Sequence, residues 1–130
     1  MTGSGGIPAS ALKDPSNILS KRSVYFDFDS NAVKDEYRGL VQAHSRYMTD
    51  KGDSRIRIEG NCDERGSREY NLGLGERRGN AVSSSLGSAG ASSSQLNVVS
   101  YGEERPVCKD HSEGCWQKNR RVEIVYTAKQ

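Results

Sequence analysis

An acidic loop followed by an arginine is the part of this 130-residue chain whose side chains could do chemistry. Asp63 and Glu64 come directly after an expected strand, and ligands collect at the carboxyl ends of strands in open α/β sheets. Gly60 and Gly66 bend this loop and let a ligand approach its backbone. Asp63 could take an ammonium group and Arg78 a carboxylate, so the pair could bind a zwitterion, such as the free end of an amino acid.

Arg78 also has two simpler interpretations. It interrupts an apolar stripe, and an arginine is rarely buried without a partner. Its side chain could extend past the stripe to solvent, or it could form an internal salt bridge with Asp63. The sequence alone leaves these alternatives open beside the ligand-binding one.

The arginine is carried by an expected helix over residues 67–86. Asn71, Leu74, Arg78 and Val82 follow one another at spacings of three and four, so they share one face. Each interior glycine costs roughly 1 kcal/mol relative to alanine, which makes this helix weak. The glycines in question are Gly73, Gly75 and Gly79. If position 79 is an ordinary helical site, alanine there should stabilise the fold.

The elements around this helix predict an α/β (α+β) two-layer sandwich. Its four-stranded mixed sheet, with a largely parallel core, carries helices packed on it in the order strand, helix, strand, helix, strand, strand. The expected strands cover residues 23–30, 55–60, 96–102 and 120–126, and the first helix runs from about Val33 to Gly52. His44 lies on the apolar face of that helix, which is typical of a packed core histidine. We expect residues 1–20 to be a flexible tail and residues 21–130 to form one domain.

Charge and composition exclude several classes. Nineteen basic residues against seventeen acidic ones give a net charge of +2, too balanced to predict a nucleic-acid partner. Arg120 and Arg121 with Trp116 could stack on RNA bases, but the charge gives this no support. No apolar run approaches the ~20 residues that a membrane helix needs. The first residues lack the charged and apolar regions of a signal peptide.

Three cysteines allow a disulfide or a metal site. Cys108 and Cys115 lie close together in an expected loop, which suits a disulfide and leaves Cys62 as a free thiol. This weakly favours an oxidising compartment. In the alternative, His111 joins the two cysteines as zinc ligands, with Cys62 or Asp63 as the fourth. The C-x6-C spacing fits no common zinc knuckle.

Six blocks occur in order along most of the chain and resemble the OmpA-like peptidoglycan-binding domain family. They are VYFDFD, EGNCDERG, EYN, LGERR, VSYGEERPVC and CWQKNRRVE, between about Val24 and Tyr126. The helix carries the family motif Asn-x-x-Leu-Gly-x-x-Arg, here Asn71 to Arg78. Glycine stands at 73 and 79 where alanine is usual, which puts stability in doubt more than binding. Cys62 replaces a common alanine or threonine, and its oxidation could disturb the site.

The resemblance implies a periplasmic domain that is tethered to the outer membrane by a lipid anchor and binds the meso-diaminopimelate of the peptidoglycan stem peptide without catalysis, cofactor or metal. It also implies a partnership with the periplasmic β-propeller protein of the Tol system, in support of envelope integrity and cell division. The lipid-bearing N-terminal cysteine of such proteins is absent here, so we expect this chain to be a soluble fragment.

The resemblance further implies which residues bind. Asp63 and Arg78 would grip the diaminopimelate end, and the other expected pocket residues are Phe28, Asp29, Leu74, Asn71 and Arg120. Two other classes of function stay open from the residues themselves. One is an enzyme, either a zinc hydrolase using Cys108, His111 and Cys115 or a glycosidase using Glu64. The other is a protein-interaction domain with a purely structural Asp63–Arg78 pair.

Overall fold

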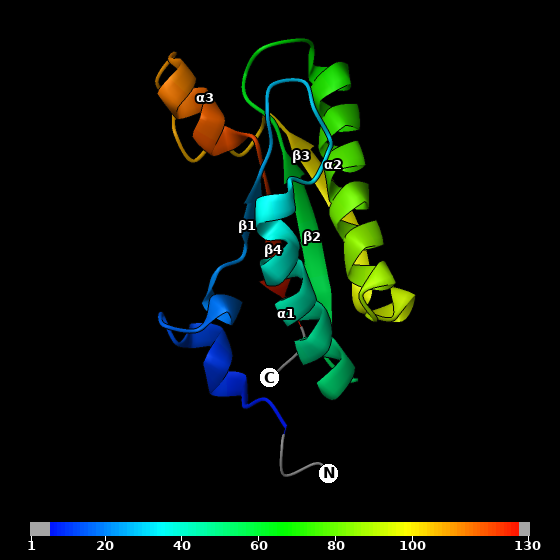
Figure 1. Ribbon diagram of the computed structural model, residues 1–130. Helices are drawn as coiled ribbons and strands as arrows, with labels where there is room; N and C mark the ends of the chain where they lie inside the picture. Colours follow the sequence, from blue (N-terminus) through cyan, green and yellow to red (C-terminus); the bar gives the residue numbers. More distant parts are fainter. Residues whose placement is uncertain (1–5, 128–130) are drawn as a thin grey trace.

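The structure is a computed structural model that describes residues 6–127 (Figure 1). Its strands are β1 (Ser23–Tyr25), β2 (Ile56–Asn61), β3 (Leu96–Gly102) and β4 (Arg121–Tyr126), and its α-helices are α1 (Arg38–Asp50), α2 (Arg68–Ser88) and α3 (Glu113–Asn119). Short 3-10 helices cover Ala9–Lys13, Ile18–Ser20, Asp35–Tyr37 and Ser93–Gln95. No helix in the described range is both long and apolar enough to cross a membrane.

The four strands form one mixed sheet, as the sequence predicts, and their order in the sheet is β1-β4-β2-β3. The expectation of a largely parallel core is wrong, because only β2 and β3 pair in parallel. β4 is antiparallel to both β1 and β2. β4 lies between β1 and β2, the two strands that α1 connects. These two strands therefore do not pair with each other.

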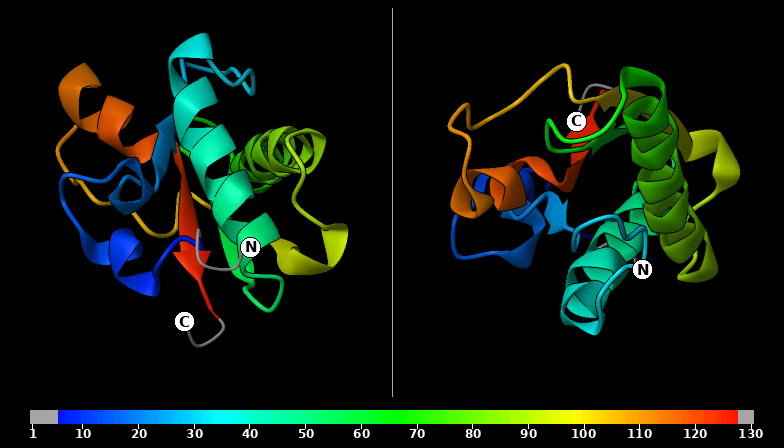
Figure 2. Two further views of the ribbon diagram at one scale, coloured as in Figure 1. Left: turned by 60° about the horizontal axis from the view of Figure 1, so that its bottom comes forward. Right: turned by 90° about the horizontal axis from the view of Figure 1, so that it is seen from above.

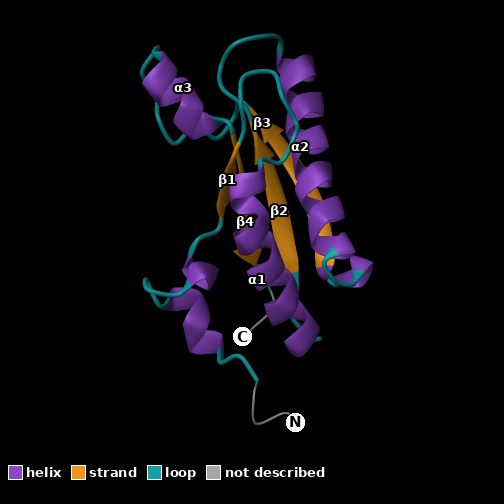
Figure 3. Ribbon diagram, in the orientation of Figure 1, coloured by secondary structure: helices purple, strands orange, loops and turns teal. Residues whose placement is uncertain are grey.

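Helices α1 and α2 cover one face of this sheet (Figures 2 and 3), which confirms the two-layer architecture. Alternate residues of the central strands point at them because side chains alternate along a strand. Ile56 and Ile58 of β2 and Val122 and Ile124 of β4 are each at most 1% exposed. These residues anchor the core and fix the register of the strands that end at the site.

Three local expectations need correction. β1 ends at Tyr25 rather than near residue 30, because the chain turns into a loop in which Asp29 has a φ of 53°. α1 begins at Arg38 rather than Val33, since Lys34 is extended and only a 3-10 turn precedes the helix. The expected loop around the cysteines contains α3, whose Ser112 caps it by accepting from the Cys115 N–H.

Residues 6–20 pack on the domain, whereas residues 1–5 of the expected flexible tail lie outside the described residues. Leu12 and Leu19, on the two N-terminal 3-10 helices, are 4% and 3% exposed and belong to the main core cluster. Arg22 ties this stretch to β1 by donating from Nη2 to the carbonyl oxygen of Leu12 at 2.8 Å. The domain boundary that we expected at residue 21 stays a prediction.

His44 is a packed core histidine, as expected. Its side chain is fully buried, Nε2 lies 2.8 Å from the Lys21 carbonyl oxygen and Nδ1 lies 2.7 Å from the Tyr126 hydroxyl. A carbonyl can only accept, so Nε2 carries the proton and Nδ1 accepts from the tyrosine. Burial lowers the pKa of His44 to about 4, which keeps the ring neutral at pH 7.

α2 lies unusually close to the sheet because glycines face each other across the contact. A Cβ on Gly60 of β2 would overlap the carbonyl oxygen of Gly75 of α2. A Cβ on Gly79 would come 2.7 Å from Cγ1 of Val98 on β3. Position 79 is therefore not an ordinary helical site, and the expectation that alanine there stabilises the fold no longer holds.

Candidate functional site

A cavity of about 240 Å³ opens where β2 ends, between the β1–α1 loop, the β2–α2 loop and the first turns of α2. Its lining residues are Phe28, Asp29, Cys62, Asp63, Arg65, Gly66, Tyr70, Asn71, Leu74 and Arg78. Six of the seven residues that we predicted for the site therefore come together around one cavity. The seventh, Arg120, lies behind its wall and reaches Asp63.

Arg78 is completely buried, yet it bonds to backbone carbonyls rather than to a carboxylate. Its Nε, Nη1 and Nη2 atoms donate to the carbonyl oxygens of Ser30, Asn61 and Asp27 at 2.8, 3.0 and 3.1 Å. Within residues 6–127 its guanidinium forms no ion pair, so the internal salt bridge with Asp63 is wrong, and so is the extended, solvated side chain. Burial lowers the pKa of Arg78, whereas nearby Cys62 and Asp63 act in the opposite direction.

The close packing of α2 explains how an arginine can occupy this place. Gly75, about one turn before the arginine, and Gly79, directly after it, bring the helix backbone against β2 and β3. The side chain then passes over the ring of Phe26, with its guanidinium carbon 5.3 Å from the ring centre, to the loop carbonyls. Its cationic end lies at the floor of the cavity with only neutral dipoles bonded to it, so the site favours an added anion.

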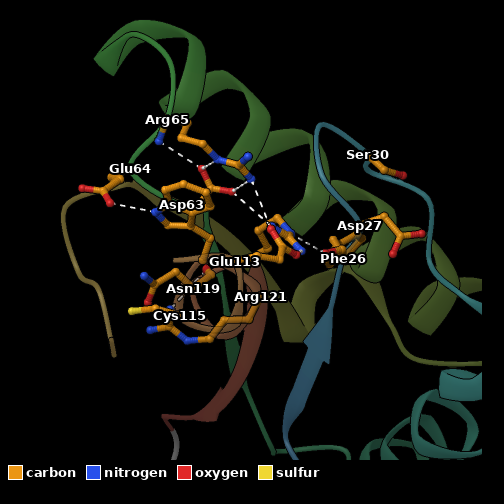
Figure 4. A network of polar contacts seen from close by, with 12 residues as sticks. Phe26, Asp27, Ser30, Asp63, Glu64, Arg65, Glu113, Cys115, Asn119 and Arg121 are labelled. Carbon is orange, nitrogen blue, oxygen red and sulfur yellow. Dashed lines mark hydrogen bonds and ion pairs between the residues drawn. The ribbon is translucent and has the colours of Figure 1, made fainter. Parts of the chain in front are cut away.

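Asp63, 5% exposed, is paired with two other arginines (Figure 4). Arg65 forms a fork with it, with Nε to Oδ1 at 3.2 Å and Nη2 to Oδ2 at 2.9 Å. Nη1 of Arg120 adds a bond to Oδ2 at 3.3 Å. Burial acts to raise the pKa of Asp63, but the hydrogen bonds from Arg65 and Arg120 outweigh it and hold that pKa below its ordinary value.

Arg120 is itself fixed from three sides. It donates from Nε to the Phe26 carbonyl oxygen at 2.9 Å and from Nη2 to Glu113 Oε2 at 2.8 Å, in addition to its bond with Asp63. Its side chain is only 5% exposed. We infer that Arg120 positions Asp63 rather than meeting a ligand itself.

Arg65 is the main site residue that sequence reasoning missed. Its guanidinium carbon lies 4.2 Å from the ring centre of Phe28 and 4.1 Å from that of Trp116, so it stacks on both. Trp116 is held in turn because its Nε1 donates to Glu64 Oε2 at 2.7 Å, an atom that also lies 2.6 Å from His111 Nδ1. The only sequence signal for Arg65 is its position two residues after Asp63.

The remaining wall residues hold the loops in shape. Asn71, 2% exposed, donates from Nδ2 to the Arg65 carbonyl oxygen at 3.0 Å and to Glu103 Oε1 at 2.8 Å. Tyr70, which sequence reasoning also missed, donates its hydroxyl hydrogen to Asp29. Leu74 is 5% exposed and supplies apolar wall.

The cysteines behave as predicted. Cys108 and Cys115 form a disulfide with their Cα atoms 5.3 Å apart, and Cys62 is a free, buried thiol. The zinc alternative is wrong, because disulfide sulfurs cannot serve as thiolate ligands. Burial raises the pKa of the Cys62 thiol to about 11, which makes it a poor nucleophile.

Comparison with known proteins identifies a family and several relatives. The model of the OmpA family matches residues 25–120. The chain is 43% identical over 121 residues to the peptidoglycan-associated lipoprotein of Pseudomonas aeruginosa, covering 93% of this chain and 71% of that protein. It is 41% identical over 104 residues to the protein of the same name from Haemophilus influenzae, covering 80% of this chain and 68% of that one.

Solved structures give the same picture. The crystal structure of the peptidoglycan-associated lipoprotein from Burkholderia pseudomallei superimposes with a TM-score of 0.89 at 47% identity, over 90% of this chain and 99% of that chain. The C-terminal domain of Helicobacter pylori MotB shares the fold, with a TM-score of 0.76 at 22% identity over 84% of this chain and 86% of that chain.

Proposed function

Because the chain belongs to the OmpA family, we propose that it is a non-enzymatic module that binds peptidoglycan through the diaminopimelate of its stem peptide. Diaminopimelate differs from lysine by one extra carboxylate at its far end, which therefore carries both an ammonium and a carboxylate. In this proposal Arg78 takes the carboxylate and Asp63 takes the ammonium. Charge-assisted hydrogen bonds at a largely preformed site supply the affinity.

The observation that carries the proposal is the buried arginine at the cavity floor. Arg78 is 0% exposed, donates to three neutral carbonyls and has no carboxylate paired with it in the described chain, although buried charges are normally paired. A ligand carboxylate supplies the missing negative charge in the right place. A guanidinium also grips a carboxylate in a two-point fork, which a lysine at this position could not do.

The setting of the proposal follows the names of the relatives. A peptidoglycan-associated lipoprotein joins a lipid anchor to a cell-wall ligand, so we place this domain at the periplasmic face of the outer membrane, lipid-anchored in its full-length form. The disulfide between Cys108 and Cys115 suits that oxidising compartment. We further propose the propeller protein of the Tol system as a partner, with a role in envelope integrity and cell division.

The enzyme alternatives have less support. Glu64, the candidate for glycosidase chemistry, accepts hydrogen bonds from Trp116 and His111 that lower its pKa. A general acid in glycoside hydrolysis needs the opposite shift. The relatives are also named for their association with peptidoglycan and not for an activity on it.

Calorimetric titration with three muropeptides tests the proposal. The first carries meso-diaminopimelate, the second lysine, which lacks the far carboxylate, and the third 2-aminopimelate, which lacks the far ammonium. We expect the first to bind at least tenfold more tightly than either counterpart. Equal affinity for the lysine and diaminopimelate forms would refute the assignment of Arg78.

Variants of the two charged residues complete the test. Asp63→Ala should weaken binding of the diaminopimelate form at least tenfold, because an unpaired ligand ammonium costs ~2–5 kcal/mol. Asp53→Ala, in the exposed α1–β2 turn, is the matched control and should bind like the parent. Arg78→Lys should also be impaired. Since Arg78 is buried on three carbonyls, its variant is compared at equal folded fraction, checked by circular dichroism.

A further inference from the structure

The acceptor positions of Asp63 are already full. Oδ1 accepts from the Arg65 backbone N–H at 3.0 Å and from Arg65 Nε at 3.2 Å, while Oδ2 accepts from Arg65 Nη2 at 2.9 Å and Arg120 Nη1 at 3.3 Å. A carboxylate offers about four such positions. A ligand ammonium can therefore reach Asp63 only by replacing a donor that is there now.

Arg65 is the donor that can leave. The Arg120 side chain is 5% exposed and is held by Phe26 and Glu113 as well as by Asp63. The Arg65 side chain is 33% exposed, and its hydrogen bonds in the described chain all go to Asp63. Removing Arg65 from the carboxylate thus breaks one fork, whereas removing Arg120 would also break its bonds to the Phe26 carbonyl oxygen and to Glu113.

A second resting place for Arg65 lies next to the first. Its Nη2 is already 3.8 Å from Glu113 Oε1, a carboxylate that is 62% exposed. Its guanidinium carbon lies 4.2 Å from the ring centre of Phe28 and 4.1 Å from that of Trp116. The guanidinium can therefore stay stacked on these rings while it shifts towards Glu113. The arginine can exchange Asp63 for Glu113 without losing an anionic partner.

We propose that Arg65 is a specificity-determining residue that occupies the ammonium position at Asp63 and yields it only to a ligand that brings its own cation. This rests on the proposed function. A ligand end with a carboxylate alone cannot replace the guanidinium, so it meets an arginine where the diaminopimelate ammonium would sit. The site therefore selects its ligand by exchange of one cation for another, with Glu113 receiving the displaced side chain.

Arg65→Met tests the inference, because methionine keeps a flexible apolar stem and removes the competing charge. We expect this variant to bind the diaminopimelate muropeptide roughly threefold to tenfold more tightly than the parent, and the 2-aminopimelate form no more tightly. Arg65→Lys, which still pairs with Asp63 but without a fork or a planar stack, should show a smaller gain. Arg68→Met is the control, since it removes an equal charge from an exposed ion pair with Glu104.

A double-mutant cycle with Glu113→Gln examines the second resting place. Glu113→Gln should weaken diaminopimelate binding in the parent by a larger factor than in the Arg65→Met background. Equal factors would overturn the role of Glu113. Weaker or unchanged diaminopimelate binding by folded Arg65→Met, while the parent binds, would overturn the inference and leave the proposed function standing. If the parent does not bind at all, both fail.

Discussion

α1 and α2 cover the same face of the sheet by opposite means. α1 fills the interface with large side chains such as Tyr47 and Met48, both fully buried, and its buried histidine, His44, is neutral. α2 brings glycines against the strands, and the largest side chain that it buries is the charged Arg78. The first helix stabilises the fold by burying apolar side chains. The second has a lower helix propensity and buries a charged side chain in place of an apolar one, which holds a cation at the cavity floor.

The difference explains why α2 looks unstable as an isolated sequence. Some of its glycines lower helix propensity but are needed by the fold. Gly75 and Gly79 let α2 approach the sheet closely, and this close packing lets Arg78 reach the loop carbonyls. The comparison separates glycines that the fold needs from glycines that it merely contains, and each can be tested by adding one methyl group.

The largest effect is expected at Gly60, the β2 partner of this contact. In Gly60→Ala the new Cβ would overlap backbone atoms of Gly75, which cannot rotate away. We expect a loss of at least about 3 kcal/mol, at the upper end for overpacked cores, or no folded protein. Urea unfolding followed by circular dichroism measures it. Gly52→Ala, whose Cβ would meet nothing within 4 Å, should stay near the parent.

Features with a local sequence period were predicted correctly, whereas features that depend on residues far apart in the chain were missed. The buried face of α2 was correct because its spacing of three and four residues is a local signal. α3 was missed because seven residues hardly display a helical period. The place of β4 between β1 and β2 depends on tertiary pairing, so the largely parallel core was an error.

The site shows the same limit. Asp63 and Arg78 were found because a charge in a glycine-rich loop and a charge in an apolar stripe stand out in a sequence. The partners of Arg78 are carbonyls, and every residue has a carbonyl, so no sequence pattern marks them. Arg65 was missed for a related reason, since stacking on Phe28 and Trp116 joins segments far apart in the chain.

The second prediction concerns the neutral buried group of α1. The pKa of His44 falls from 6.5 to about 4 on folding, so the unfolded chain binds more protons between these values. The contribution of His44 to the free energy of unfolding is therefore fully present above pH 6.5 and is lost as the pH falls towards 4. From 1.36 kcal/mol per pKa unit, the loss amounts to roughly 3 kcal/mol.

Urea unfolding of the parent and of His44→Gln at several pH values between 4 and 7 isolates the contribution of His44 to the pH dependence of stability. Glutamine can still donate to the Lys21 carbonyl oxygen but does not titrate, so the variant should be less stable at pH 7 and show a flatter pH dependence. Parallel curves for the two proteins would mean that His44 is not the group responsible.

The third prediction is a smaller loss at Gly79. Alanine there gains up to ~1 kcal/mol of helix propensity, but its Cβ meets Val98 Cγ1 at 2.7 Å, and overpacking typically costs 1–3 kcal/mol. We expect a net loss of about 1 kcal/mol in Gly79→Ala. In a Val98→Ala background, which removes the obstructing methyl, the same change should become stabilising. If it is destabilising by the same amount in both backgrounds, contact with Val98 is not the cause.

The smallest effect is expected at Gly87, on the last turn of the same helix. Gly87 has a negative φ and is exposed, and a Cβ there would meet nothing within 4 Å. Nothing in the described chain requires glycine at this position, so alanine should narrow the unfolded ensemble and favour the helix. We expect Gly87→Ala to raise stability by up to ~1 kcal/mol, seen as a higher urea midpoint with an unchanged m-value. A gain at 87 beside a loss at 79 would confirm that distance to the sheet, rather than the weakness of glycine itself, decides which glycines α2 needs. A loss at both positions would instead mean that α2 requires flexibility along its whole length, and the contrast with α1 would no longer rest on packing.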